Sequence, residues 1–169
     1  MLFRIVAFMT KTTIEWTWKK FDDFSSADLY ALLAARIEVF VVEQECPYQE
    51  LDGRDRDAYH LCGTGQNGLA AYLRLLPPGS HHPEPAIGRV MSVAGSRGSG
   101  LGRELLVRGI RGCREYFPGQ TLRVSAQAHL ESFYESLGFV TCSAAYDEDG
   151  IPHIDMLLAP SEQRESALS

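Results

Sequence analysis

The sequence predicts an α/β protein built on a mixed β-sheet with helices on its faces. Short apolar runs typical of strands recur along the chain, and two longer segments carry the apolar stripe of an amphipathic helix. The elements follow the order β-α-β-β-β-α-β-α-β-β, which combines adjacent antiparallel strands with helical crossovers. With 169 residues, the chain has the length of one domain with a sizeable core.

The first third of the chain is expected to form a strand, a helix and a long polar segment. Alternating apolar residues predict a strand over 14–21. Ser25 is the N-cap of the next helix, Asp28 completes a capping box, and the apolar stripe continues to Val41. The acidic segment 42–56 is long for a loop without structure, so we expect it to be functional or to contain a short helix.

A β-hairpin is predicted next, with strands over 58–63 and 69–76. The dipeptide Asn67-Gly68 near their junction is typical of tight hairpin turns. A loop rich in Pro, Gly and His, over 77–85, then leads into a further strand over 86–93.

The second half of the chain alternates helices and strands. We expect a helix over 101–117, a strand over 122–126, a short helix over 130–137, a strand over 139–146, a turn over 147–150 and a last strand over 151–158. Gly109 and Gly112 each weaken the first of these helices by about 1 kcal/mol relative to Ala. That helix therefore depends on packing against the rest of the protein.

Composition restricts the partners and the compartment. A net charge of −6 and a pI of about 5.3 argue against nucleic acid as the main partner. No apolar run reaches the length of a membrane helix, so we expect a cytoplasmic protein with no membrane partner. The four cysteines are widely spaced, which predicts reduced thiols and no metal site. One domain over 14–158 is expected between a flexible extension (1–13) and a polar tail (159–169).

The most informative motif is Arg-Gly-Ser-Gly-Leu-Gly at residues 97–102, between a strand and a helix. Glycines permit positive φ angles and close approach of a ligand, and the start of a helix offers unpaired N–H groups. Such a turn can hold a diphosphate. No Lys follows as in a Walker A loop, and the glycine spacing differs from that of a dinucleotide site. For the hexapeptide alone, an ordinary glycine-rich surface turn remains open.

Two motifs together carry a family resemblance. The Arg-x-x-Gly-x-Gly string at 97–102 and Phe-Tyr-Glu-Ser-Leu-Gly-Phe at 133–139 resemble the GNAT N-acetyltransferase superfamily. Residues 39–53, 126–134 and 149–154 resemble its ElaA family, and the likeness spans residues 14–158. It implies the GNAT fold, with six to seven strands, helices on both faces and a V-shaped slot. Ala94 and Gln127 depart from the wider pattern, which often has Pro and Asn there.

The resemblance implies an enzyme that transfers acetyl from acetyl-CoA directly to an amine, on a small molecule or on a peptide or protein. The alternative is a catalytically idle CoA-binding or interaction module of the same fold, and a homodimer is plausible. The residues implied in donor binding are Met91, Ser92, Val93, Arg97, Gly98, Ser99, Gly100, Leu101, Gly102, Arg103, Gln127, Phe133 and Tyr134.

The resemblance also implies catalytic roles. Tyr134 is the candidate general acid that protonates the leaving thiolate, although its position equally suits a core residue. Glu43, His60 and His153 are candidate bases for the amine, and each also suits a structural role. We therefore leave the identity of the base open.

The acceptor is expected on the side of residues 42–55. Candidate contacts are Arg36, Glu43, Gln44 and Tyr48. Arg36 interrupts an apolar helical stripe, so it either reaches solvent or grips a carboxylate of the acceptor. The five acids of residues 42–55 favour a cationic acceptor, but a solvated loop explains them equally well.

Overall fold

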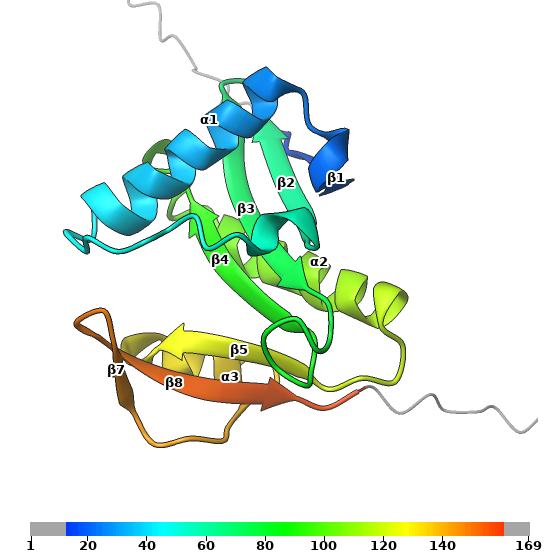
Figure 1. Ribbon diagram of the computed structural model, residues 1–169, viewed down its shortest axis with the longest axis vertical. Coiled ribbons are helices and arrows are strands. Elements are labelled where there is room, and N and C mark those ends of the chain that lie inside the picture. The colour runs from blue at the N-terminus through cyan, green and yellow to red at the C-terminus, as the bar shows by residue number, and fades with distance from the viewer. Residues whose placement is uncertain (1–12, 161–169) are drawn as a thin grey trace, which may run out of the picture.

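The predicted strands form one eight-stranded mixed sheet in the computed structural model, which describes residues 13–160 (Figure 1). Its order is β1-β2-β3-β4-β5-β8-β6, and β7 also pairs with β8. The strands are β1 (Glu15–Lys20), β2 (Tyr59–Gly65), β3 (Gly68–Leu76), β4 (Ala86–Ser92), β5 (Leu122–Gln127), β6 (Val140–Thr141), β7 (Tyr146–Glu148) and β8 (Ile151–Leu158). The predicted extension and tail fall mainly on residues 1–12 and 161–169, outside the described residues.

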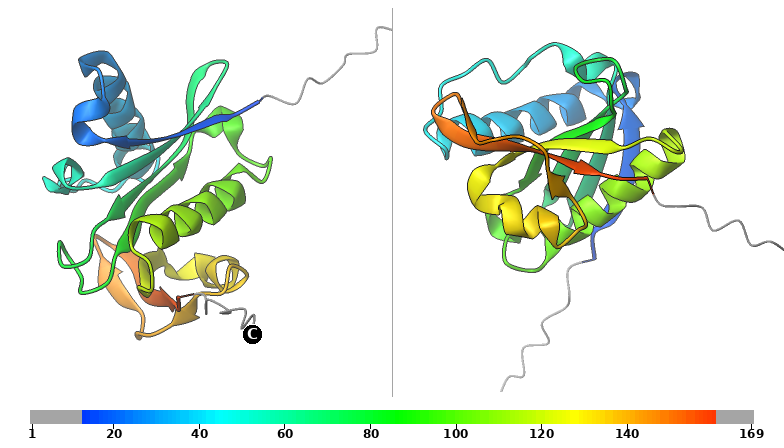
Figure 2. Two further views of the ribbon diagram at one scale, coloured as in Figure 1. Left: turned by 90° about the vertical axis from the view of Figure 1, so that its right-hand side faces the viewer. Right: turned by 90° about the horizontal axis from the view of Figure 1, so that it is seen from below.

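Helices cover both faces of the sheet, as expected (Figure 2). The α-helices are α1 (Ser26–Ile37), α2 (Leu101–Tyr116) and α3 (Glu131–Glu135). Side chains alternate between the two faces along each strand. Leu73 of β3 therefore packs with α2 and α3, whereas its neighbour Tyr72 packs with α1. Within the described part of the chain, no helix has the length and apolarity needed to cross a membrane.

The predicted start of α1 is confirmed, but its end differs. The Asp28 N–H donates to Ser25 Oγ at 3.1 Å, which satisfies one free donor of the first turn. At its other end the helix widens into a π-helical turn over Glu38–Val42. Such turns are frequent near functional sites. A short 3₁₀ turn, Arg54–Arg56, lies in the long polar segment, which was expected to be functional or to contain a short helix.

The single strand predicted over 139–146 is wrong, because it is two short strands, β6 and β7. Thr141 pairs with Met156 and Tyr146 pairs with His153. Between these two pairs, the segment that joins β6 to β7 therefore has two more residues than β8. Between the two strands, the Asp155 N–H donates to Ser143 Oγ at 2.9 Å. A side chain thus replaces the backbone partner there and interrupts the strand.

Strands β4 and β5 part after a short parallel contact. Their register covers only Ala86 with Arg123 and the next pair. Beyond it, β4 pairs with β3 through a register shift that gives β4 one extra residue. Arg89 lies in this bulge with a φ of 52°, an unusual value for a residue with a side chain. Because a bulge bends and twists its strand, β4 turns away from β5, as Figure 1 shows.

Candidate active site

A cleft of about 430 Å³ lies where β4 and β5 diverge. Residues 88–90 of β4 and 125–127 of β5 form two of its walls. Parts of segment 44–54 and of the β7–β8 turn form the others. The size is typical of small-molecule sites.

The end of β4 has one edge free toward this gap. The Val93 N–H donates to Ala70 O of β3 at 3.0 Å, so these two residues form a hydrogen-bonded pair. Such pairs alternate with non-bonded ones along an antiparallel ladder. Ser92, between the bonded positions, therefore directs its N–H and C=O away from β3. Arg97 Nε donates to this carbonyl at 3.0 Å. Of the three β4 positions predicted to bind the donor, only Ser92 therefore has its amide on the open edge; those of Met91 and Val93 face β3.

The glycine loop has the conformation that anion binding needs. Gly98 and Gly100 have φ angles of 80° and 81°, which favour glycine. The N–H groups of residues 98–102 have no partner among the described residues, whereas those of Arg103 and Glu104 both donate to Gly100 O. Nothing lies within 4 Å of a Cβ built at either glycine, so the loop is open to a ligand. With the positive end of the α2 dipole behind it, the loop fits a diphosphate.

Two further predicted donor contacts lie beside this loop, and both are engaged within the protein. Arg97 forms an ion pair with Glu43 at 2.6 Å, half exposed to solvent. Arg103 donates to Ser136 Oγ at 2.8 Å.

Tyr134 of α3 lines the cleft. Its ring packs edge-on against Phe133 and Phe139, and only 6% of the residue is exposed. Burial raises the pKa of Tyr134 to about 12. The hydroxyl, which makes no hydrogen bond within the described residues, therefore stays protonated at neutral pH. A buried proton donor at the floor of a cleft suits the role that the sequence suggests for this residue.

The structure separates the three candidate bases. His153 lines the cleft opposite Gln127 of β5, and its Nδ1 lies 2.8 Å from Ile151 O. Because a carbonyl only accepts, that nitrogen carries the proton and Nε2 has a free lone pair. Glu43 lies outside the cleft lining, in the ion pair with Arg97.

His60 does not reach the cleft. It is fully buried, with its ring nitrogens 2.7 Å from the Tyr72 hydroxyl and 2.9 Å from Asp55 O. Burial lowers the pKa of His60, so the ring is neutral and accepts the tyrosine proton in a hydrogen bond. The structural interpretation of this residue is therefore favoured, and no local pattern in the sequence indicates its partners.

On the acceptor side, the cleft brings together Gln44 and Tyr48 as expected, but not Arg36. Gln127 Nε2 donates to Gln44 Oε1 at 3.1 Å across the cleft. Arg36 neither reaches solvent nor faces the cleft, because it is fully buried and donates to Glu50 and Asp55 at 2.7–3.0 Å.

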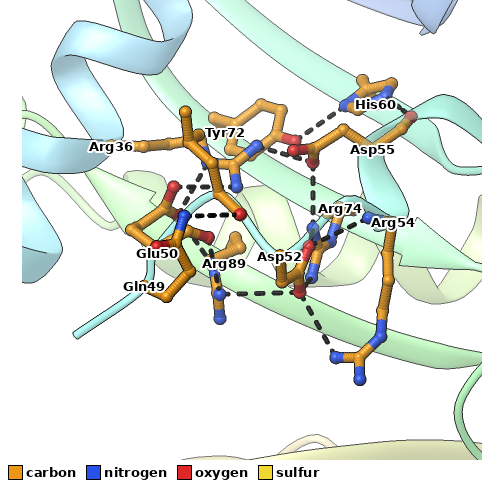
Figure 3. A network of polar contacts seen from close by, with 11 residues as sticks. Arg36, Gln49, Glu50, Asp52, Arg54, Asp55, His60, Tyr72, Arg74 and Arg89 are labelled. Atoms are coloured by element: carbon orange, nitrogen blue, oxygen red, sulfur yellow. Dashed lines mark hydrogen bonds and ion pairs between the residues drawn. The ribbon is translucent and has the colours of Figure 1, made fainter.

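A buried ion network behind the cleft was not foreseen from the sequence (Figure 3). Its members are Arg36, Arg54, Arg74 and Arg89 with Glu50, Asp52 and Asp55. Burial alone would raise the pKa of Asp52, but the hydrogen bonds and charge of Arg74 outweigh it and hold that pKa below its usual range. Arg74 was the available signal, since it interrupts an otherwise apolar strand.

This network corrects the expectation that the acids of residues 42–55 favour a cationic acceptor. Glu43, Glu50, Asp52 and Asp55 each form an ion pair with at least one arginine. The negative charge of these four of the five acids is therefore neutralised within the protein and does not by itself favour a cation.

Comparison with known proteins agrees with this architecture. Residues 23–159 match the family model of the acetyltransferase (GNAT) domain. Protein ElaA of Escherichia coli is 41% identical over 145 residues, 85% of this chain and 95% of that protein, and a UPF0039 protein of Synechocystis is 43% identical over 85% and 94%.

Solved structures give the same result. The crystal structure of an acyl-CoA N-acyltransferase from Pseudomonas aeruginosa has a TM-score of 0.83 and 46% identity, covering 87% of this chain and 100% of that one. The crystal structure of Escherichia coli ElaA has a TM-score of 0.81 and 40% identity, covering 86% and 99%. These matches extend over nearly the whole described domain and confirm the predicted fold. The chain therefore belongs to the GNAT acetyltransferase family and, within it, to the ElaA group.

Proposed function

We propose that this protein is an acetyl-CoA-dependent N-acetyltransferase that acts on a soluble amine. Membership of the GNAT family supports acyl transfer from a coenzyme A thioester. The observation that carries the proposal is the combination of three features around the end of β4. They are the free N–H groups of residues 98–102, the open edge of β4 at Ser92, and the cleft that ends on Tyr134.

The donor would bind from the loop toward the cleft. The N–H groups of residues 98–102 would hold the diphosphate, assisted by the α2 dipole. The amide-rich pantetheine arm would pair with the edge of β4 as an added strand does. In this arrangement, Arg97 gives up its bond to Ser92 O, which becomes an acceptor for the arm. The bound donor supplies an activated acetyl thioester.

The residues of the cleft would then stabilise the negative charge that develops and transfer the protons. An N–H group on the open edge of β4 polarises the thioester carbonyl as its oxygen gains negative charge. His153 Nε2, which is free to accept a proton, takes one from the amine while the amine nitrogen forms its bond to the acetyl carbon. The carbon–sulfur bond breaks, and Tyr134 gives its proton to the departing thiolate. Because the raised pKa makes Tyr134 a weaker acid than a free phenol, its proton moves only as negative charge builds up on the departing sulfur.

The test is release of free thiol from acetyl-CoA with a panel of amines. We expect wild type to turn over at least one amine, and Tyr134→Phe to lower kcat by about 100-fold with little change in KM, because general acids contribute about 10²–10⁴. Tyr116→Phe is the matched control, since Tyr116 lies on the outer end of α2 and stacks on Tyr59. Unchanged turnover in Tyr134→Phe would remove this residue from the mechanism. No thiol release with any amine would favour the idle CoA-binding module.

A further inference from the structure

The ion network behind the cleft carries one positive charge in excess. Four guanidinium groups (Arg36, Arg54, Arg74 and Arg89) face three carboxylates (Glu50, Asp52 and Asp55). His60, which borders the network, is neutral because burial lowers its pKa. The network therefore presents a net positive charge to an anion that binds beside it.

The excess positive charge is exposed to the cleft at Arg54. Among residues 13–160, its one ion pair is a 3.3 Å contact to Asp52, whose carboxylate already accepts two bonds from Arg74 at 2.6 and 2.7 Å. The Arg54 side chain is 38% exposed and lines the cleft. In Figure 3 its guanidinium lies at the outer end of the network, away from Arg36. Arg54 is thus the most exposed arginine of the network and the one most accessible to a ligand.

The surroundings of Arg54 favour the same kind of ligand. His81 and His82 line the cleft and offer further N–H donors. Burial, with the nearby charge of Arg54, lowers the pKa of His81, so its ring is neutral but still donates. Arg74 also lines the cleft, and its Nε is a buried donor without a partner among the described residues.

The cleft lining also contains acidic side chains. They are Glu148, at the end of β7, and Asp149, in the turn that follows, and both are exposed. A cleft that holds groups of both charges suits a small molecule that carries both an amine and a carboxylate.

We propose that the acceptor is an amino acid or a close relative, whose carboxylate pairs with Arg54 while its amine faces the thioester. This inference rests on the proposed acyltransferase function and names its substrate class. It replaces the expectation of a cationic acceptor, because four of the five acids that suggested one are already paired. Arg54 acts as a specificity residue and takes no part in the proton transfers.

The experiment compares amino acids with their matched amides as acceptors, using thiol release from acetyl-CoA. Each pair differs only in the carboxylate. For each amino acid and each amide, we compare kcat/KM of wild type with that of Arg54→Gln. Because both enzymes act on the same acceptor, the intrinsic reactivity of its amine does not affect the ratio. We expect the variant to lose about tenfold with the acids, mainly through KM, and less than twofold with the amides. Arg111→Gln is the matched control, since that arginine is 82% exposed on the outer side of α2.

The outcomes separate this inference from the proposed function. Equal losses for acids and amides, or no loss for either, would overturn the role of Arg54 while leaving acyl transfer intact. If wild type turns over no amine, the proposed function fails, and binding of N-acetyl amino acids and their amides is then measured by calorimetry. Carboxylate-dependent binding that Arg54→Gln abolishes would still support the anion site, and its absence would refute it.

Discussion

Gly112→Ala tests how α2 is seated on the sheet. In an exposed helix this change stabilises by about 1 kcal/mol. Here a Cβ at position 112 would lie 2.7 Å from Cε2 of Trp18 in β1 and would also collide with Cζ2 of the same ring. Favourable carbon contacts need about 3.5–4.0 Å. Overpacking costs about 1–3 kcal/mol, and the rigid ring puts this site at the upper end. We therefore expect a net destabilisation of about 1–2 kcal/mol.

Urea unfolding, followed by far-UV circular dichroism, measures this change. The matched control is Arg111→Ala, in the same turn of α2 but exposed to solvent, which we expect to stay within about 0.5 kcal/mol of wild type. A displaced α2 also moves the loop at its N-terminus, so the affinity of Gly112→Ala for CoA is expected to fall. If Gly112→Ala is as stable as wild type or more so, then the close contact with Trp18 is refuted.

The remaining predictions concern the buried network. Glu50→Gln removes an ion-pair partner of both Arg36 and Arg89, and we expect a loss of about 3 kcal/mol in the free energy of unfolding by urea titration, whereas a loss below about 1 kcal/mol would contradict a buried pair. The folded protein lowers the pKa of both His60 and Asp52, so both take up protons more readily when unfolded. Stability is therefore expected to change little between about pH 6.5 and pH 8, to decline below this range and to fall steeply below about pH 4. A urea midpoint that is flat down to pH 4 would argue against this.

Local signals predicted most of the fold. The Ser25 cap, the Asn-Gly turn and the periodicity of each strand depend on neighbours close in the sequence. The single strand over 139–146 was wrong because its break depends on Ser143 replacing a backbone partner of Asp155, a contact with a distant strand. Apolar patterning alone carries no information about such an exchange.

The site was only partly predictable. The glycine loop and Tyr134 lie along one path because the family pattern specifies both, although their roles stay predictions until tested. The ion network escaped sequence reasoning because its members are distant in the chain; Arg89 and Glu50 are 39 residues apart. The conformation of Arg89, in a bulge with positive φ, is equally invisible in the sequence. As a result, loop acids that suggested an open acidic wall are instead paired with arginines.

Binding of coenzyme A, compared with binding of pantetheine, tests the central claim most directly. Pantetheine keeps the arm and the thiol but lacks the diphosphate that the N–H groups of residues 98–102 would hold. Two charge-assisted hydrogen bonds of about 1.5 kcal/mol each correspond to about 100-fold in affinity. Isothermal calorimetry is expected to show coenzyme A binding at least that much more tightly than pantetheine. Equal affinities, or no binding of coenzyme A, would contradict the account.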